Sequence, residues 1–571
     1  MNKKSLKTLA VGLTVAFSLS ACAGNNAGNN KDNNASSTAS SSASNSAGST
    51  KQADPAVDPL GKFPEPIEVS LGRGVDPTYK YEGNDTAEDN VYTRWLKDSY
   101  NIVVKDEWEA APADYGQKVS LAIASNDLPD AMLVNETQLR QMVKAGQLAD
   151  LTEVYEKYGA DRLKDIYKTN PGLLEGVTFD GKLYALPETT LPSAPLTWIR
   201  KDWLDKLKLD APKTLQDLEN VAKAFIDNKM GGDHTLGIVG TQQGGSLYST
   251  FLSSSDHFMN FSSIFFANDA YPGIWVKDAS GNAVYGSTTA ETKETLALMR
   301  DWYAKGILDK EIGLRKSTKE ALTSGQAGIF FGPWWSPYDL QDAIKSNPEA
   351  NWRPYAAPLD KAGVFNSNQA TGSNFIVVKK KYEHPEAVIK MLNLHVSEKA
   401  ESYKTAVGKE MTSQEIPLFL IMGHGDQLEY AVKTTQKVLT GEMKLEEVDK
   451  VNYGFTYELA SHVKNIKKEP FDNYDIQYWD QKTDPDFFAH IYAHLNGGST
   501  FVNANINYVK SLATAQTKTM QTKWTNLKKL EDETFLKIIM GVSPIDEFDT
   551  FVAKWKQQGG DEITAEVNEL K

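Results

Sequence analysis

A single cysteine, Cys22, limits how this chain can be stabilised, because one thiol cannot form an intramolecular disulfide. The 571 residues must therefore be held together by packing. One hydrophobic core rarely keeps growing beyond about 250–300 residues, so we expect at least two lobes. Hydrophobic residues make up 40% of the composition and charged residues 24%, which is typical of a globular protein and excludes a polytopic membrane protein.

The charge balance is acidic. The chain has 61 lysines and arginines against 75 aspartates and glutamates, and its formal net charge is −14. Phosphate backbones and anionic lipid surfaces attract positively charged proteins, so we expect no nucleic-acid partner and no adsorption to a membrane by charge. The 12 tryptophans, 24 tyrosines and 22 phenylalanines are sufficient for surfaces on which a flat ligand stacks.

The N-terminus has the pattern of a secretory signal. Residues 1–7 are cationic, and the apolar run at 8–18 is too short to span a bilayer as a mature helix. The sequence Leu19-Ser20-Ala21-Cys22 then resembles the lipobox of a bacterial lipoprotein signal. The resemblance implies a signal peptide at 1–21, cleavage before Cys22, and lipid on the Cys22 sulfur that anchors the protein to the cell membrane. The alternative is an ordinary signal peptide with an incidental thiol.

Residues 23–53 consist mostly of Asn, Gly, Ser, Ala and Thr. Such a segment has too little apolar mass to offset the entropy of ordering, so we expect a disordered tether over 22–62. A coil of this composition has a mean reach of roughly 30 Å. A folded body is then expected over 63–571, outside the cytoplasm and beside a membrane that the chain does not cross.

Strand and helix patterns alternate from about residue 63, which predicts an α/β lobe with a largely parallel sheet. A cluster of prolines at 187–195 indicates a first crossing into a second lobe. Near the C-terminus, Ser543 and Pro544 predict the start of a helix that ends before Gly559. The clearest patterns are strands at 67–71, 102–104, 131–134, 196–200, 328–331 and 375–378, and helices at 92–100 and 115–124.

In this order, the segments resemble the family-one extracellular solute-binding proteins of bacterial ABC importers, in particular the large carbohydrate-binding lipoproteins. The matching stretches are 121–130, 146–152, 180–187, 327–335, 375–378 and the tail over 538–560. The resemblance implies a two-lobed, periplasmic-binding-protein-like α/β fold of type II with the ligand in a cleft between the lobes. It implies one lobe at about 64–190 plus 354–395, and the other at about 191–353 plus 396–571.

The resemblance also implies a function. The protein is expected to bind an oligosaccharide in the cleft and to deliver it to the permease subunits of an ABC importer, as a monomer without a cofactor and without catalysis. A secreted glycoside hydrolase is the alternative, since it needs only two carboxylates about 5–10 Å apart. The chain has no Gly-x-Ser-x-Gly elbow, His-Glu-x-x-His helix or P-loop. A surface adhesin without a small ligand is a third possibility.

Aromatic residues are the first candidates for sugar contacts, because their faces stack on the C–H face of a pyranose. Relatives stack sugar on a Gly-Pro-Trp turn, which here is Gly332-Pro333-Trp334-Trp335 with Tyr338 close behind. Neighbours on an extended segment point in opposite directions, so at most one of the two tryptophans is expected to face the cleft. Trp275 and Trp198 are further candidates, with core packing as the alternative.

Polar candidates lie in loops at strand ends and at the crossing. Arg73 and Asp127 could hydrogen-bond sugar hydroxyls or an acidic sugar, or could be ordinary turn residues. Glu188 follows the strand before the proposed crossing and either binds ligand or is a surface carboxylate. His490 and His494 lie four residues apart without a third ligand signal, so we interpret them as a helix surface rather than a metal site. We predict no structural calcium, because the loop at 227–233 is too short for an oxygen cage and includes Lys229.

Overall fold

The structure is a computed structural model, and it describes residues 58–569 apart from 78, 82, 171, 190–191, 241–246, 251–258, 316–317, 369–373, 398–414, 451, 466–484 and 515. The expected signal peptide, Cys22 and nearly all of the expected tether lie outside the described residues. No helix in the described part of the chain is both long and apolar enough to cross a membrane.

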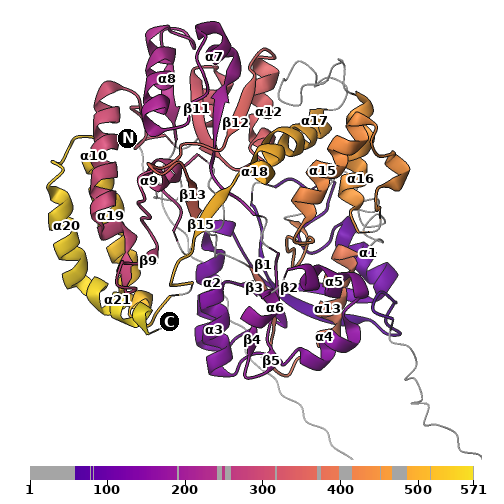
Figure 1. The fold of residues 1–571 in the computed structure, drawn as a ribbon. Coiled ribbons are helices and arrows are strands. Elements are labelled where there is room, and N and C mark those ends of the chain that lie inside the picture. The colour runs from indigo at the N-terminus through magenta and orange to yellow at the C-terminus, as the bar shows by residue number, and fades with distance from the viewer. Residues whose placement is uncertain are drawn as a thin grey trace, which may run out of the picture. The chain divides into compact units, whose positions relative to one another are not determined.

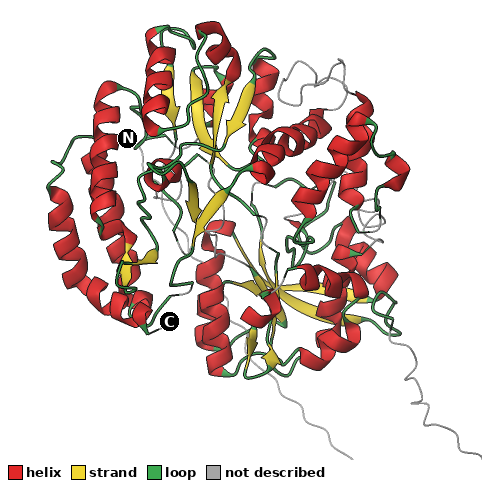
Figure 2. Ribbon diagram, in the orientation of Figure 1, coloured by secondary structure: helices red, strands yellow, loops and turns green. Residues whose placement is uncertain are grey.

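The first lobe is built on a five-stranded sheet with the order β2-β1-β3-β14-β6. Its strands are drawn in yellow in the lower part of Figure 2. Strand β1 runs parallel to β2 and β3, whereas β14 is antiparallel to both β3 and β6. The carboxyl ends of β1, β2 and β3 therefore meet at one edge of the sheet, where ligands bind in open α/β folds. The strands are β1 (Ile67–Gly74), β2 (Ile102–Ala110), β3 (Ala131–Val134), β6 (Leu186–Pro187) and β14 (Phe375–Val378).

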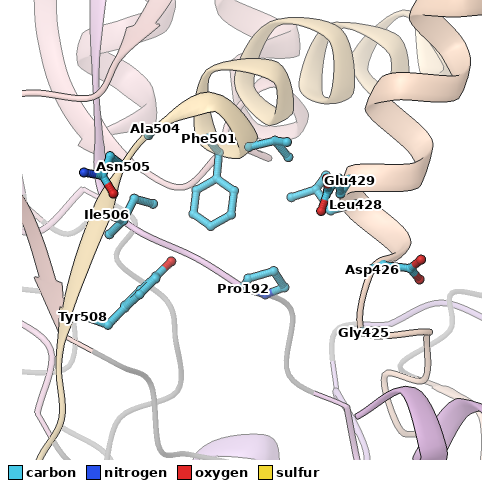
Figure 3. A pocket seen from close by; sticks show the side chains of 11 residues that line it. Pro192, Gly425, Asp426, Leu428, Glu429, Phe501, Ala504, Asn505, Ile506 and Tyr508 are labelled. Carbon is cyan, nitrogen blue, oxygen red and sulfur yellow. The ribbon is translucent and has the colours of Figure 1, made fainter.

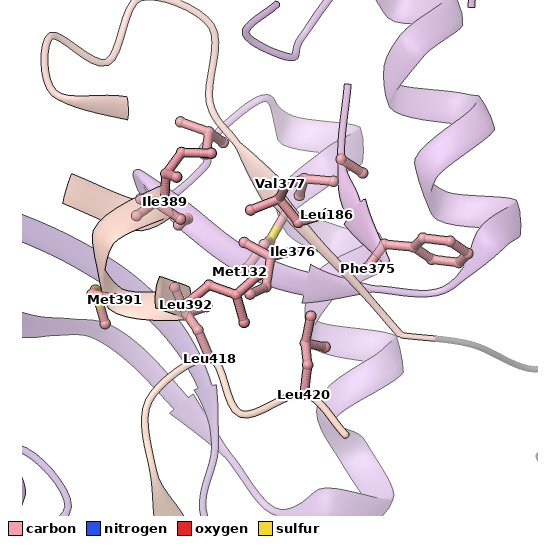
Figure 4. Packing of buried hydrophobic residues seen from close by; sticks show 14 of the residues in the cluster. Met132, Leu186, Phe375, Ile376, Val377, Ile389, Met391, Leu392, Leu418 and Leu420 are labelled. Atoms are coloured by element: carbon pink, nitrogen blue, oxygen red, sulfur yellow. The ribbon is translucent and has the colours of Figure 1, made fainter. Parts of the chain in front are cut away.

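Helices cover this sheet, and side-chain caps fix where several of them begin. Asn90 caps α1 and Asn135 caps α3: each side chain accepts from the backbone amide of the third helical residue, and each cap amide donates to the side chain of that residue. The fully buried Ile376 and Val377 of β14 belong to the central core of this lobe (Figure 4). The helices are α1 (Val91–Tyr100), α2 (Pro112–Ser125), α3 (Glu136–Ala145), α4 (Thr152–Tyr158), α5 (Asp161–Thr169), α6 (Leu173–Gly176) and α13 (Pro385–Val396), and a small hairpin joins β4 (Thr178–Phe179) to β5 (Lys182–Leu183).

The second lobe contains a four-stranded sheet with the order β12-β7-β11-β8. Its strands are β7 (Leu196–Arg200), β8 (Leu236–Val239), β11 (Ala327–Gly332) and β12 (Trp352–Tyr355). Alternate residues of β7 and β11 enter two different cores: Ile199 and Ile329 pack on one side, and Trp198 and Phe330 on the other. The sheet is therefore covered on both faces.

One face carries α7 (Lys201–Leu207), α8 (Leu215–Asp227) and α10 (Ala290–Lys305) together with the C-terminal helices α19 (Met520–Ile539), α20 (Glu547–Trp555) and α21 (Asp561–Asn568). In Figure 1, α10 and α19 lie side by side, and α20 lies outside α19. The other face packs against α12 (Pro337–Ser346), α15 (Gln427–Thr440), α17 (Pro485–Tyr492) and α18 (Ser499–Asn503). Smaller elements are α9 (Ser262–Phe266), α11 (Lys319–Thr323), α16 (Gly454–Ser461), β9 (Trp275–Lys277) and β10 (Ala283–Tyr285).

Two segments belong to lobes other than the ones expected from the sequence. β12 pairs with β7, and β13 (Phe365–Asn368) pairs in parallel with β15 (Ile506–Val509), so the return to the first lobe comes after β13 rather than at 354. Residues 416–420 pack into the core of the first lobe, so the boundary expected at 396 is also too early. Local sequence patterns do not specify which lobe these segments join, because strand pairing and core packing decide it.

Candidate ligand-binding site

In the part of the chain that the structure describes, three segments cross between the lobes: the first begins at Glu188, the second includes Asn374 and the third includes Ile421. Hydrogen bonds connect them. The first crossing begins at Glu188, whose backbone amide donates to the Asn374 carbonyl of the second crossing at 3.0 Å. Thr189 donates its backbone amide to the Ile421 carbonyl of the third crossing at 2.8 Å. The Gly423 amide returns a hydrogen bond to the Thr189 hydroxyl at 2.8 Å. The three segments therefore form one hydrogen-bonded unit where they leave the first lobe.

Glu188 is 9% exposed and lies within this unit. Its Oε1 accepts hydrogen bonds from the backbone amide of Asn374 at 2.7 Å and from Nδ2 of the same residue at 3.0 Å. Burial raises the pKa of Glu188, while the hydrogen bonds from Asn374 and from the Ile421 backbone act in the opposite direction. Glu188, a candidate for ligand contact in the sequence, therefore connects the first crossing to the second.

A pocket of about 370 Å³ lies beside the first and third crossings (Figure 3). Pro192 comes from the first crossing, residues 425–429 from the third crossing and the start of α15, and residues 501–508 from α18 and β15. The lining consists of Pro192, Gly425, Asp426, Leu428, Glu429, Phe501, Val502, Ala504, Asn505, Ile506 and Tyr508. Two crossings and the second lobe therefore contribute to one concave surface.

The pocket combines apolar rings with a few polar groups, which is the usual composition of a small-ligand site. The rings of Phe501, Tyr508 and Pro192 face the same space in Figure 3. The Tyr508 hydroxyl donates to the Ser193 carbonyl at 3.3 Å, and burial raises the pKa of Tyr508 to about 12. Asp426 and Asn505 are exposed and can meet a polar ligand from the pocket wall.

The turn Gly332-Pro333-Trp334-Trp335 contacts the first crossing at Pro192. β11 ends at Gly332 and Pro337 begins α12, and the Ser336 hydroxyl closes the turn on the Pro333 carbonyl at 2.7 Å. Trp334 is 5% exposed, and its Nε1 donates to the Pro192 carbonyl at 3.3 Å. Trp335 is half-buried and meets Trp334 edge to face at an interplanar angle of 88°. Of the two rings, Trp335 is the more accessible.

Behind Trp334 lies a π-helical turn, η7 (Ala493–Gly498). A Cβ atom on Gly497 would lie 2.0 Å from the Trp334 carbonyl oxygen, so only glycine permits this approach. The His494 ring packs against Trp334 with centroids 4.9 Å apart, and burial lowers the pKa of His494 to about 4. The interpretation of His494 as a helix-surface residue is therefore wrong, because the π turn directs its ring toward the tryptophan. His490 instead hydrogen-bonds the Tyr338 hydroxyl at 2.9 Å.

Tyr338 is consequently a partner of His490, and burial raises the pKa of its hydroxyl. Trp198 and Trp275 are both fully buried, so neither has an accessible face for a sugar. Trp198 donates its Nε1 to the Pro333 carbonyl at 3.2 Å and thereby supports the tryptophan turn from within the core. Trp275 packs among Tyr285, Trp524 and Trp555. For these two tryptophans the core alternative holds.

Arg73 is at the expected carboxyl edge of β1, but its guanidinium is occupied. It is 4% exposed, and Nη1 donates to Asp106 at 3.0 Å and to the Ala87 carbonyl at 2.6 Å, while Nη2 donates to the Glu415 carbonyl at 2.9 Å. Burial raises the pKa of Asp106 to about 6, although Arg73 acts against this rise. Arg73 therefore organises this edge rather than offering a free cation.

Asp127 is exposed and lies in the loop that leads into β3. A loop that precedes a parallel strand lies at the amino edge of the sheet, opposite the edge where β1, β2 and β3 end. The position expected for Asp127 in the cleft is therefore wrong. Among the residues that the structure describes, no group of three or more His, Cys, Asp and Glu side chains is arranged to hold a metal ion.

Comparison with known proteins decides the family. Residues 81–402, more than half of the chain, match the model of the bacterial extracellular solute-binding protein family. The chain belongs to this family. This agrees with the resemblance in the sequence.

This solute-binding protein is 28% identical to the polygalacturonan/rhamnogalacturonan-binding protein YtcQ of Bacillus subtilis (strain 168) over 233 residues, which are 39% of its length and 43% of the relative's. It thus aligns with less than half of YtcQ. It is 22% identical to lipoprotein LipO of the same strain over 477 residues, covering 82% of the chain and 86% of LipO. The crystal structure of the alginate-binding protein AlgQ2 without calcium ion matches with a TM-score of 0.58 at 15% identity, covering 89% and 98% of the two chains. The expected two-lobed type II fold is confirmed.

The structure adds an aromatic pair of the solute-binding protein that the sequence analysis missed. Trp108 is half-buried at the carboxyl end of β2, with its ring centroid 5.6 Å from that of Tyr115. A Cβ atom on Gly72 would lie 2.2 Å from the Trp108 ring, so glycine in β1 makes room for it. The period-2 pattern continues beyond the strand expected at 102–104 and could have revealed Trp108. Phe501 and Tyr508 have no comparable signal, because their position depends on how the C-terminal segment packs.

Proposed function

We propose that this protein binds an oligosaccharide between its lobes and delivers it to the permease subunits of an ABC importer. The observation that supports this most is the pocket beside the crossings, where Phe501 and Tyr508 face exposed polar groups. Its volume of about 370 Å³ is within the range of roughly 300–1,000 Å³ of small-ligand sites. The names of two similar proteins, which refer to polygalacturonan and alginate, support a carbohydrate ligand.

The arrangement of the crossings supports a mechanism that couples ligand binding to the arrangement of the two lobes. A ligand that contacts both lobes binds one lobe arrangement more tightly than others and shifts the equilibrium toward it by that difference in affinity. The pocket wall includes residues of two crossings, so a sugar in it contacts the segments about which the lobes turn. Trp108 at the edge of the first lobe and Trp335 at the edge of the second provide accessible aromatic rings for the same ligand.

Binding without turnover is part of the proposal. The pocket has two carboxylates, but Asp426 accepts a hydrogen bond from the Tyr453 hydroxyl at 2.7 Å and Glu429 pairs with Lys433 one helical turn away. Both belong to the start of one helix, and they do not flank the pocket from opposite sides as an acid and a nucleophile do. A glycoside hydrolase remains the alternative function, and reducing-sugar release from the same oligosaccharides distinguishes the two.

The membrane anchor is a separate part of the proposal. Signal cleavage before Cys22 and lipid attachment to its sulfur make the expected tether over 22–62 the link between the membrane and a monomeric receptor outside the cytoplasm. A Cys22→Ser variant is expected to be released into the medium, whereas the unmodified chain stays with the membrane fraction. Retention of the variant on membranes would contradict the lipid anchor.

The function is tested by a thermal-shift screen of the purified chain from residue 58 against oligosaccharides of several linkages and lengths. A ligand that binds only the folded state raises the melting temperature in a concentration-dependent manner. We expect saturable stabilisation by at least one oligosaccharide and no hydrolysis of it. Hydrolysis would establish the enzyme instead, and no stabilisation by any glycan would refute carbohydrate binding.

A further inference from the structure

The pocket wall carries negative charge and no described positive charge. Asp426 and Glu429 line it, and both side chains are exposed. None of its described lining residues is Lys, Arg or His. Lys433 reaches Glu429 from the next turn of α15, so Asp426 is the lining carboxylate that no described cation neutralises.

At the carboxyl edge of the first-lobe sheet, the described arginine of β1 is held by hydrogen bonds. Arg73 is the arginine of β1 at this edge, and its guanidinium donates hydrogen bonds to Asp106 and to two backbone carbonyls. Glu109, which is the residue of β2 paired with Arg73 in the strand register, is exposed and adds a further carboxylate to this edge. Lys118 is a cation near this edge, and its ammonium lies 5.8 Å from the Trp108 ring.

We infer that the ligand is an uncharged oligosaccharide and not a uronic-acid oligosaccharide, an inference that rests on the proposed function. A polyuronate carries one carboxylate per sugar, and proteins recognise carboxylates with paired arginine and lysine donors. In the pocket such a ligand meets the Asp426 carboxylate instead. The chain's net charge of −14 also repels it at longer range.

This ligand differs from those named for two similar proteins, polygalacturonan for YtcQ and alginate for AlgQ2. Identities of 28% over part of the chain and of 15% allow the same fold to hold a different set of charges. Hydroxyl groups of a neutral sugar, in contrast, donate hydrogen bonds to carboxylates such as Asp426, and these charge-assisted bonds are stronger than neutral ones.

Isothermal titration with length-matched neutral oligosaccharides, oligogalacturonates and oligoalginates tests the inference. We expect a neutral oligosaccharide to bind at least tenfold more tightly than any uronate at low salt. Raising the salt concentration should reduce this difference in affinity between neutral oligosaccharides and uronates. Screening weakens the repulsion between exposed charges and leaves neutral hydroxyl contacts largely unaffected.

The matched variants are Asp426→Asn and Asp233→Asn. The first change keeps a side-chain oxygen that accepts from Tyr453, and Asp233 is an exposed carboxylate outside the pocket lining whose loss changes the net charge equally. We expect the Asp426→Asn change to improve uronate affinity several-fold and the Asp233→Asn change to leave it within twofold. Tighter binding of a uronate than of every neutral oligosaccharide would overturn this inference and leave the proposed function standing. Absence of binding in both classes would overturn the proposed function itself.

Discussion

The carboxylate of Glu188 accepts two hydrogen bonds from Asn374, one from its backbone amide at 2.7 Å and one from its side chain at 3.0 Å. The two residues belong to different crossings between the lobes, so this contact fixes where the first and second crossings leave the first lobe. A buried acceptor that is removed leaves its donors without partners, which costs more than the hydrogen bond itself contributes.

Replacing Glu188 by alanine tests this contact. The variant leaves the Asn374 amide without its acceptor, so the free energy of unfolding should fall by about 1–3 kcal/mol. Urea denaturation measures it, with Glu446→Ala as a control on an exposed glutamate. Equal stability of the two variants would show that the Glu188 contact contributes nothing.

Substitutions of Trp335 and Trp275 distinguish a role in ligand contact from a role in core packing. Trp335→Ala should weaken oligosaccharide binding by about 1–2 kcal/mol, the scale of one aromatic stack, with little change in melting temperature. Trp275→Phe should lower the melting temperature, because its ring is fully buried, and leave the affinity within twofold. Titration calorimetry and thermal unfolding of both variants measure these effects. If Trp275→Phe weakened binding and Trp335→Ala only lowered the melting temperature, the ligand would lie elsewhere.

The ion pair of Arg73 and Asp106 should be among the most sensitive sites of the first lobe. Both side chains are at most 4% exposed, so Arg73→Ala leaves a buried carboxylate uncompensated and should cost about 3–5 kcal/mol. Arg94→Ala removes an arginine whose side chain is 47% exposed, and such surface pairs contribute about 0–1 kcal/mol. Denaturant titration should therefore separate the two variants clearly, and similar midpoints would contradict the burial of this pair.

Because His494 is buried, the free energy of unfolding depends on pH. Its pKa is about 4 in the fold and near its ordinary value of 6.5 in the unfolded chain, so the unfolded state binds the proton first as the pH falls. The stability that this neutral ring contributes is fully present above pH 6.5 and is lost between about pH 6 and pH 4, at about 1.4 kcal/mol per pH unit.

His494→Phe should reduce the fall in unfolding free energy between pH 6.5 and 4. It should not abolish it, because burial lowers the pKa of His395 to about 4 as well. Urea unfolding of both proteins across this pH range measures the difference. Parallel curves for the variant and the unmodified protein would mean that His494 is accessible to protons in the fold.

The sequence was sufficient for the alternating architecture and for the tryptophan turn, because both depend on local patterns. Strand β1, the crossing after Pro187 and the turn at Gly332 follow from alternation and from proline and glycine positions. The C-terminal helix is also present, although α20 begins at Glu547 because residues 544–546 form a turn before it.

The candidate site was less accessible to sequence reasoning. The sequence does not reveal that Arg73, at the end of a strand, pairs with the buried Asp106. It also does not reveal that the second face of the sheet is covered, which buries Trp198. Phe501 and Tyr508 come together with Pro192 only through contacts between segments far apart in the chain. Pairing and burial decide these roles, and neither can be read from local spacing.

The most direct test of oligosaccharide binding at the crossings is isothermal titration of a neutral oligosaccharide panel into the unmodified protein and the Phe501→Ala variant. The Phe501 ring lines the pocket and is 7% exposed, so its loss removes stacking area. We predict saturable one-to-one binding that is at least tenfold weaker in the variant. Equal affinity of a folded Phe501→Ala variant would contradict the assigned site, and the absence of binding in both proteins would contradict the function.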